Sequence, residues 1–345
     1  MAGESVPVRP DEREARLTLI RKQAEQFGRV EASGVRPPGA PFPHASPETG
    51  YYGVPLLKPP QWKWEIPLYF FVGGATASSA VISSVADWLG ADPKLARDAR
   101  WVAVAGSVIS GGLLIADLGR PERFLAMLRV FKLQSPMSMG AWILTAFSSA
   151  TGAAAFTTWA RERYGDSLPL TIVNESAKAM SALFGLPFSN YTGVLIGATA
   201  IPVWNRNVKT LPVHFGASGV EAGVSILELL GHDHPALNAL ALGSAAWESW
   251  EGFHLERRRD PLLDPLKHGT SGWITRLGGV LSGPIPLILR SMIAMRGGKN
   301  SELRRVAAYC GVAGSLLTRY GWMMAGKVSA QKSSTGTEAH PEKQA

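Results

Sequence analysis

Titratable side chains recur at helical spacing in an otherwise apolar stretch after residue 210. His214, Ser218, Glu221, Ser225 and Glu228 follow one another at intervals of four and three residues, so they share one face of a helix. Titratable groups inside a membrane are costly, and they indicate an ion or proton path or a buried binding site. We expect a proton path here. The same spacing equally fits carboxylates that are protonated or paired in a polar interior.

The next apolar stretch extends this pattern. Glu248, Glu251 and His254 lie within about a third of a helix circumference, and the two glutamates join the predicted proton path. Arg319 lies in the last apolar stretch, and we expect it to pair with one of the glutamates, because a buried cation needs a partner.

A second set of polar residues lies at the ends of apolar stretches. Glu65 and Tyr69 are four apart, which places a proton acceptor beside a phenol on one side of a helix. That pair suits a quinone carbonyl, which needs hydrogen bonds and protons, but it equally suits ordinary packing. Trp62 and Trp64 are typical of an aromatic belt at the membrane surface.

The motif Asp117-Leu-Gly-Arg-Pro-Glu-Arg-Phe124 follows the second apolar stretch. Its glycine and proline end the helix and place Asp117, Arg120 and Arg123 at the membrane boundary. Two interpretations stay open. The arginines snorkel to lipid phosphates, or the loop forms a polar rim for a ligand headgroup and, with Arg123 and Arg129, a docking surface for a soluble partner.

These residues require membrane helices to position them. Residues 137–160 and 179–205 carry no charge over 24 and 27 residues, whereas about 20 apolar residues suffice to cross a bilayer. We predict an all-α integral membrane protein with eight spans, and an amphipathic surface helix over Leu170–Phe184. The expected spans are Pro67–Leu89, Trp101–Leu118, Met139–Ala160, Ser189–Trp204, Thr210–Leu230, Pro235–His254, Trp273–Leu289 and Val306–Gly326.

The remaining sequence predicts three regions and a topology. Residues 1–60 form a polar, partly disordered arm, residues 61–329 the membrane domain, and residues 330–345 a disordered tail. Eight spans place both termini on one side, and the absence of a signal peptide predicts that this side is the cytoplasm. We therefore expect a multi-pass protein of the cell inner membrane. The net charge of +8 lies mainly on that side, so it indicates topology rather than nucleic-acid binding.

Composition limits the redox chemistry of the chain itself. Cys310 is its single cysteine, so the chain has no thiolate set for an iron–sulfur cluster. Of seven histidines, His214 and His254 fall in expected helices, and neither has an obvious axial partner for haem. We expect the chain to bind no haem, cluster or other metal.

The sequence resembles the NrfD-type membrane subunits of polysulfide-reductase-like molybdoenzyme complexes. The resemblance covers about residues 51–329 and depends on the order and spacing of several motifs. These motifs are Tyr52-Gly-Val-Pro55, Trp62-x-Trp64, Phe71-Val-Gly-Gly74, Asp117-Leu-Gly-Arg-Pro-Glu-Arg-Phe124, Ser135-Pro-Met-Ser-Met-Gly-Ala-Trp142, Tyr191-Thr-Gly-Val-Leu-Ile-Gly-Ala-Thr-Ala200, Arg319-Tyr-Gly-Trp322 and Gly326-Lys-Val-Ser329.

The resemblance implies two four-helix bundles and a quinone pocket in the first of them. It implies electron exchange between membrane quinone or quinol (menaquinone or ubiquinone) and a ferredoxin-like iron–sulfur subunit that serves a molybdopterin catalytic subunit. Tyr69 and Tyr191 fall on hydrogen-bonding positions of the family's first and fourth helices. Tyr69 replaces a histidine and Ile66 an amide-bearing residue, so we expect Glu65 to substitute in proton handling.

We therefore predict a quinone headgroup site formed by Glu65, Tyr69, Asp117, Arg120 and Tyr191. The chain would be a non-catalytic or quinone-reactive subunit. The complex would be polysulfide-reductase-like or formate-dehydrogenase-like, and cytoplasmic termini make a formate-dehydrogenase-like catalytic subunit plausible. Two rival functions stay open: a proton-coupled secondary transporter, which predicts inverted repeats and broken midplane helices, and a purely structural membrane anchor.

Overall fold

The computed structural model describes residues 57, 59–118, 121–297 and 301–335, together with residues 19, 30–31 and 34–35. The chain divides into two compact units, residues 59–329 and residues 1–58 with 330–345. In the smaller unit, β1 (Val30–Glu31) pairs antiparallel with β2 (Gly34–Val35). The predicted disorder of the arm and tail otherwise falls outside the described residues.

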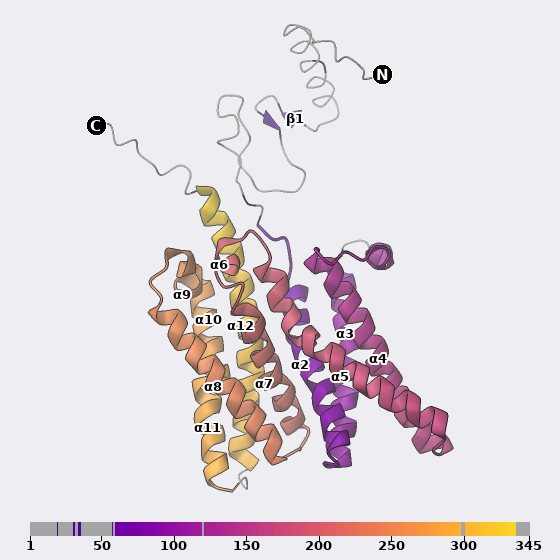
Figure 1. Ribbon diagram of the computed structural model, residues 1–345. Coiled ribbons are helices and arrows are strands. Elements are labelled where there is room, and N and C mark those ends of the chain that lie inside the picture. Colours follow the sequence, from indigo (N-terminus) through magenta and orange to yellow (C-terminus); the bar gives the residue numbers. More distant parts are fainter. Residues whose placement is uncertain are drawn as a thin grey trace, which may run out of the picture. The chain divides into compact units, whose positions relative to one another are not determined.

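The first half of the larger unit is a group of four long helices that pack consecutively (Figure 1). Neighbouring helices run antiparallel. Short loops join the first to the second and the third to the fourth, and a longer connection with a 3₁₀ helix, η2 (Pro121–Leu128), joins the second to the third. We call the end of this group at which the first helix begins the proximal end, and the opposite end the distal end. The four helices are α2 (Glu65–Trp88), α3 (Pro93–Asp117), α4 (Pro136–Tyr164) and α5 (Leu168–Gly197).

A second group of helices packs against α2 and α5 through its first long helix, α7. Proline stands near the start of all but two of its helices, where its missing N–H costs nothing. The group contains α6 (Pro202–Asn205), α7 (Leu211–Leu229), α8 (Pro235–Arg257), η3 (Pro261–Leu263), α9 (Asp264–Lys267), α10 (Gly269–Ser282), α11 (Pro284–Met295) and α12 (Ser301–Thr335).

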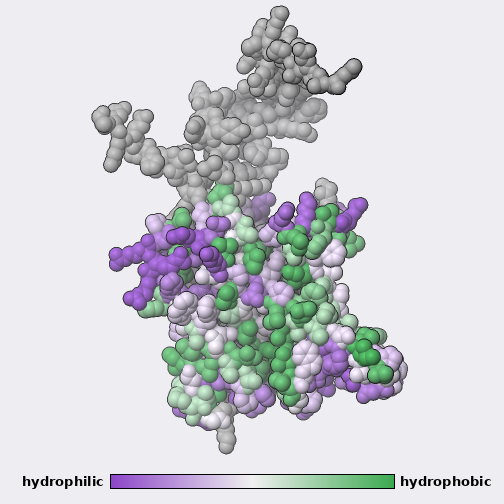
Figure 2. Space-filling model, viewed as in Figure 1, coloured by the Kyte–Doolittle hydropathy of each residue, from purple (hydrophilic) through white to green (hydrophobic). Residues whose placement is uncertain are grey.

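Length and composition confirm an all-α membrane protein. Within the described part of the chain, five helical segments are long and apolar enough to cross a bilayer: α2, α3, α4, α5 and the pair α10–α11 taken together. Apolar side chains cover much of the visible surface along the helices, and hydrophilic ones gather towards their ends (Figure 2). The count of eight spans stays a prediction, because α7, α8 and α12 are not among the five.

The amphipathic surface helix predicted over Leu170–Phe184 is wrong. These residues belong to α5, which runs unbroken through Pro187 for 30 residues. The polar side of this segment faces protein rather than lipid headgroups: Asn174 is 1 % exposed and its amide donates to Thr157 Oγ1 and Thr158 Oγ1 at 2.8 Å. Partners on α4 therefore satisfy Asn174, and Asp87 and Trp88 on α2 bind Lys178 and Glu175.

The predicted seventh span is bent and longer than expected. Helix α10 ends at Ser282, and Pro284 begins α11 after the single residue Gly283, because a proline disfavours helical geometry in the preceding residue. Helix α11 continues to Met295, six residues beyond the expected end. Arg290, one residue beyond that expected end, is therefore inside the helix group and fully buried.

Small residues let the two helix groups approach closely, as the Gly219-xxx-Gly223 spacing predicts. A Cβ atom on Gly219 would lie 3.0 Å from the backbone oxygen of Gly74 on α2, and one on Gly223 would lie 3.0 Å from that of Ala75. No side chain fits between these backbones, so α2 and α7 meet almost directly.

Candidate functional site

The residues expected to bind a quinone headgroup lie at the proximal end of the first helix group. Glu65 is the first residue of α2, and its Oε2 atom is buried with no hydrogen-bond partner among the described residues. Asp117 ends the antiparallel helix α3, accepts a hydrogen bond from the backbone N–H of Lys63 and lies within electrostatic range of Glu65 and Lys327. The fold therefore brings two carboxyl groups and a lysine together.

Tyr69 and Tyr191 lie next to one another below these carboxyl groups. Tyr69 is 3 % exposed, one turn along α2 from Glu65, and its ring centroid lies 6.5 Å from that of Phe188. Tyr191 lies within electrostatic range of Tyr69, but its hydroxyl donates to the carbonyl oxygen of Pro136 at 2.6 Å. The structure thus gives the Tyr191 hydroxyl a backbone partner at the start of α4.

Helix α12 adds two residues that the sequence did not single out for this site. The Tyr320 hydroxyl donates to the carbonyl oxygen of Trp64 at 3.0 Å and lies within electrostatic range of Glu65. Lys327 Nζ donates to the carbonyl oxygen of Trp62 at 2.6 Å. Both residues belong to motifs of the resemblance, but more than 250 residues separate them from Glu65, so spacing alone could not place them here.

The structure describes only some of the arginines that were predicted to bind a ligand or a partner at the proximal end. Arg120 and the side chain of Arg123 lie outside the described part of the chain. Arg129 directly follows η2 and is exposed, so it is accessible to a partner. Its role in docking, like that of Arg123, stays a prediction.

The residues of the predicted proton path come together in the second helix group. His214 Nδ1 lies 2.7 Å from Glu251 Oε2 and 3.6 Å from Glu248 Oε1. The second Glu248 oxygen accepts a hydrogen bond from Ser282 Oγ at 2.7 Å. His254 lies apart from this cluster, exposed and stacked on Trp250 with 5.4 Å between ring centroids.

Arg290, one residue beyond the expected end of the seventh span, joins the other two glutamates. Its Nη2 lies 3.0 Å from Glu221 Oε1 and its Nη1 lies 2.8 Å from Glu228 Oε2, with all three side chains almost fully buried. Arg319 makes no ion pair with a glutamate among the described residues, although the charge of Glu248 still acts on its guanidinium. Arg319 donates to the carbonyl oxygen of Phe215 at 2.8 Å and lies over that residue's ring.

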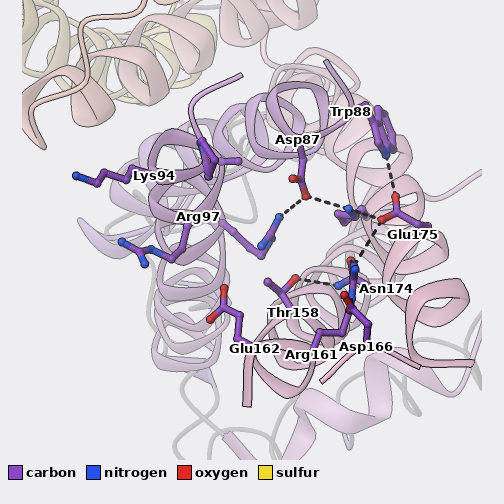
Figure 3. Close-up of a pocket in the computed structure, with 14 residues that line it drawn as sticks. Asp87, Trp88, Lys94, Arg97, Thr158, Arg161, Glu162, Asp166, Asn174 and Glu175 are labelled. Carbon is purple, nitrogen blue, oxygen red and sulfur yellow. Dashed lines mark hydrogen bonds and ion pairs between the residues drawn. The ribbon is translucent and has the colours of Figure 1, made fainter. Parts of the chain in front are cut away.

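A polar cavity of about 550 Å³ lies at the distal end of the first helix group (Figure 3). Asp87 accepts hydrogen bonds from Arg100 and Lys178 at 2.9 Å each. Lys178 Nζ also lies 2.6 Å from Glu175, which accepts a hydrogen bond from Trp88 Nε1 at 3.3 Å (Figure 3). These side chains form ion pairs and hydrogen bonds with one another, so the cluster connects α2, α3 and α5.

Two loop carboxyl groups are held ionised by arginines. Arg161 donates to Asp166 at 2.5 Å, and this hydrogen bond lowers the pKa of the Asp166 carboxyl below its ordinary value. Arg206 likewise donates to Asp260 at 2.6 Å and lowers the pKa of that carboxyl. These pairs fix the loop after α4 and the loop before η3.

The buried polar clusters between long apolar helices define the class of protein: a multi-pass, all-α membrane protein. Within this class, the family model described as "Polysulphide reductase, NrfD" matches residues 56–231, half of the sequence. The chain belongs to this family. It is also similar to a polysulfide reductase subunit from Wolinella succinogenes, with 27 % identity over 185 residues. The match covers 49 % of this chain and 58 % of that relative, so the chain spans less than two thirds of the relative's length.

Proposed function

We propose that this chain is the membrane anchor subunit of a molybdopterin oxidoreductase complex. It would exchange electrons between membrane quinone or quinol and a partner iron–sulfur subunit. Membership of the NrfD family and similarity to a polysulfide reductase subunit support the class of complex. The arrangement of Glu65, Asp117 and Tyr69 at the proximal end supports the quinone site.

The single observation that carries the proposal is the unsatisfied oxygen of Glu65. Its Oε2 atom is buried, makes no hydrogen bond within the described part of the chain, and lies near Asp117 and Tyr320. A buried acceptor without a partner is destabilising, and a quinol hydroxyl would satisfy it. The residues present therefore fit a quinone headgroup.

A bound quinone would supply two-electron chemistry in which each electron is accompanied by a proton. Glu65 would hold or accept the proton at Oε2, because no other described group uses that atom. Asp117, fixed by the backbone N–H of Lys63, would exchange protons with the proximal surface. Tyr69 and Phe188 would form the apolar wall against which the ring packs and which excludes water.

The partner surface would lie at the same proximal end. The exposed Arg129 directly follows η2 and so lies close to the Asp117 motif in sequence, which would place a positive charge near the headgroup site. A ferredoxin-like iron–sulfur subunit docked there would receive electrons over a short distance, and a molybdopterin catalytic subunit would complete the complex. With cytoplasmic termini, both soluble subunits would be cytoplasmic. An N-terminal reporter that is active only outside the cell would contradict this orientation.

Substitution of Glu65 tests the proposal. We expect Glu65→Gln in the purified complex to reduce quinone-linked turnover at least tenfold, in line with the loss of one general acid–base group, while dye-linked turnover of the catalytic subunit is unchanged. The matched control is Glu302→Gln, an exposed glutamate at the far end of α12. Equal quinone-linked turnover in both variants would contradict a role for Glu65.

A further inference from the structure

A cavity of about 460 Å³ lies in the second helix group, between α7, α8, α10 and α12. This volume falls in the range of small-molecule sites in proteins. Leu255, Leu266 and Trp322 form part of an apolar lining. None of the described residues of the headgroup site at Glu65 lines this cavity, so the two sites have different linings.

Part of the rim of the cavity is apolar and belongs to a helical segment long and apolar enough to cross a bilayer. Phe253 on α8 and Val280 on α10 line the cavity and are 62 % and 45 % exposed. Val280 lies near the middle of the membrane-spanning segment Gly269–Met295. A molecule that enters between these residues from the hydrocarbon layer must itself be soluble in lipid.

Polar atoms without partners lie in the wall of this cavity. His214 Nε2 and Thr318 Oγ1 are buried and make no hydrogen bond within the described part of the chain, and Glu248 Oε1 has only the His214 Nδ1 contact at 3.6 Å. The His214 and Glu248 side chains are more than nine-tenths buried. Unpartnered buried polar groups destabilise a fold unless a ligand or water satisfies them, so these atoms indicate a ligand with a polar head.

The charges around the cavity indicate which kind of ligand headgroup it can bind. Glu248 and Glu251 disfavour a phosphate or carboxylate, and the one arginine that lines the cavity, Arg276, already pairs with Glu256 at 2.7 Å. On the other side, His214 beside Glu251 and Arg319 near Glu248 offset the two negative charges. The cavity therefore fits a neutral head that donates hydrogen bonds to carboxylate oxygens.

We propose that this cavity is a second quinol-binding site, in which the hydroxyl groups of a dihydroquinone donate to Glu248 and Glu251. A quinol combines the features that the cavity requires: solubility in lipid, a flat ring for the apolar walls beside Trp322, and a neutral head with two O–H donors. The proposal extends the proposed function, because it places a second molecule of the same ligand class in the other helix group.

Two glycines offer a way to fill the cavity without disturbing the fold. A Cβ atom on Gly252 or Gly279 would meet no atom within 4 Å, and both residues line the cavity. Gly279→Leu therefore occupies the ligand's space. The matched control is Gly243→Leu, an exposed α8 glycine outside the cavity that also has open space around its Cβ position.

The test is anaerobic calorimetric titration of the detergent-purified complex with decylubiquinol and, separately, menadiol. We expect Gly279→Leu to weaken one binding event at least tenfold, and Glu248→Gln to weaken the same event by about tenfold through loss of a charged acceptor. Gly243→Leu should match the unmodified complex. Glu65→Gln should alter a different binding event, so that failure of either site is seen separately.

Two results would overturn the proposal. In the first, Gly279→Leu and Gly243→Leu bind both quinols as the unmodified complex does. In the second, native mass spectrometry detects a phospholipid that Gly279→Leu removes and that neither quinol displaces, so that the cavity is a lipid site.

Discussion

Arg290 on α11 bridges two glutamates on α7: its guanidinium lies 3.0 Å from Glu221 and 2.8 Å from Glu228. The glutamates are seven residues apart and therefore lie on the same face, two turns from one another. With Arg290 and Glu221 fully buried and Glu228 nearly so, the triad ties α11 to α7. This pairing gives both glutamates a structural role, and their part in a proton path stays a prediction.

Removing Arg290 should be strongly destabilising. In Arg290→Met, two carboxyl groups lose their partner in a buried site, and breaking a buried ion pair costs about 3–5 kcal/mol. We expect a large fall in the thermal unfolding midpoint in detergent. Adding Glu221→Gln and Glu228→Gln should recover most of the loss, because neutral amides need no counter-charge. No recovery in the triple variant would show that packing of the arginine, not its charge, holds α11.

Replacing Tyr191 separates a positioning role from direct quinone binding. In Tyr191→Phe the carbonyl oxygen of Pro136 loses its 2.6 Å hydrogen bond, so we expect a loss of about 0.5–1.5 kcal/mol in unfolding free energy. We also expect lower quinone-linked turnover per folded complex, because Tyr191 belongs to the predicted headgroup site. Unchanged turnover with a lowered melting temperature would show that its hydroxyl only positions the start of α4.

The sequence predicted most of the helices because hydrophobic length is a local property. Residues 137–160 and 179–205, for example, fall mainly within α4 and α5. It failed where partners distant in sequence decided the outcome. Lys178 suggested a surface helix, but Asp87 and Glu175 satisfy its charge in the protein. Arg290 fell just beyond the expected seventh span for the same reason, because its glutamate partners lie more than 60 residues away.

In the candidate site, too, local patterns could be predicted from the sequence and contacts between distant residues could not. Glu65 and Tyr69 could be paired from their spacing on one helix. Asp117 could be added, because it ends the next apolar stretch at the same side of the membrane. Tyr320 could not be added, because its distance from Glu65 depends on how α12 packs rather than on any local pattern.

Acid should loosen the connection between α4 and α5. The hydrogen bond from Arg161 lowers the pKa of Asp166, so the ionised carboxyl stabilises the fold at and above the ordinary aspartate pKa. The contribution disappears as the pH falls through the lowered value, because protonation removes the charge. We expect Asp166→Asn to unfold at a lower temperature than the unmodified protein at pH 7, and the difference to shrink towards pH 3. A difference independent of pH would contradict an electrostatic origin.

The contact between α2 and α7 should tolerate no side chain at Gly219. A Cβ atom there would lie 3.0 Å from the backbone oxygen of Gly74 and 3.1 Å from its carbonyl carbon, and backbone atoms cannot rotate away. We expect Gly219→Leu to cost at least the 1–3 kcal/mol typical of overpacking and to separate the two helix groups. Gly111→Leu on α3 is the control, because its added Cβ meets nothing within 4 Å and leucine favours a helix over glycine. Melting temperatures in detergent compare the two variants, and equal stability would show that α2 and α7 lie further apart than this structure places them.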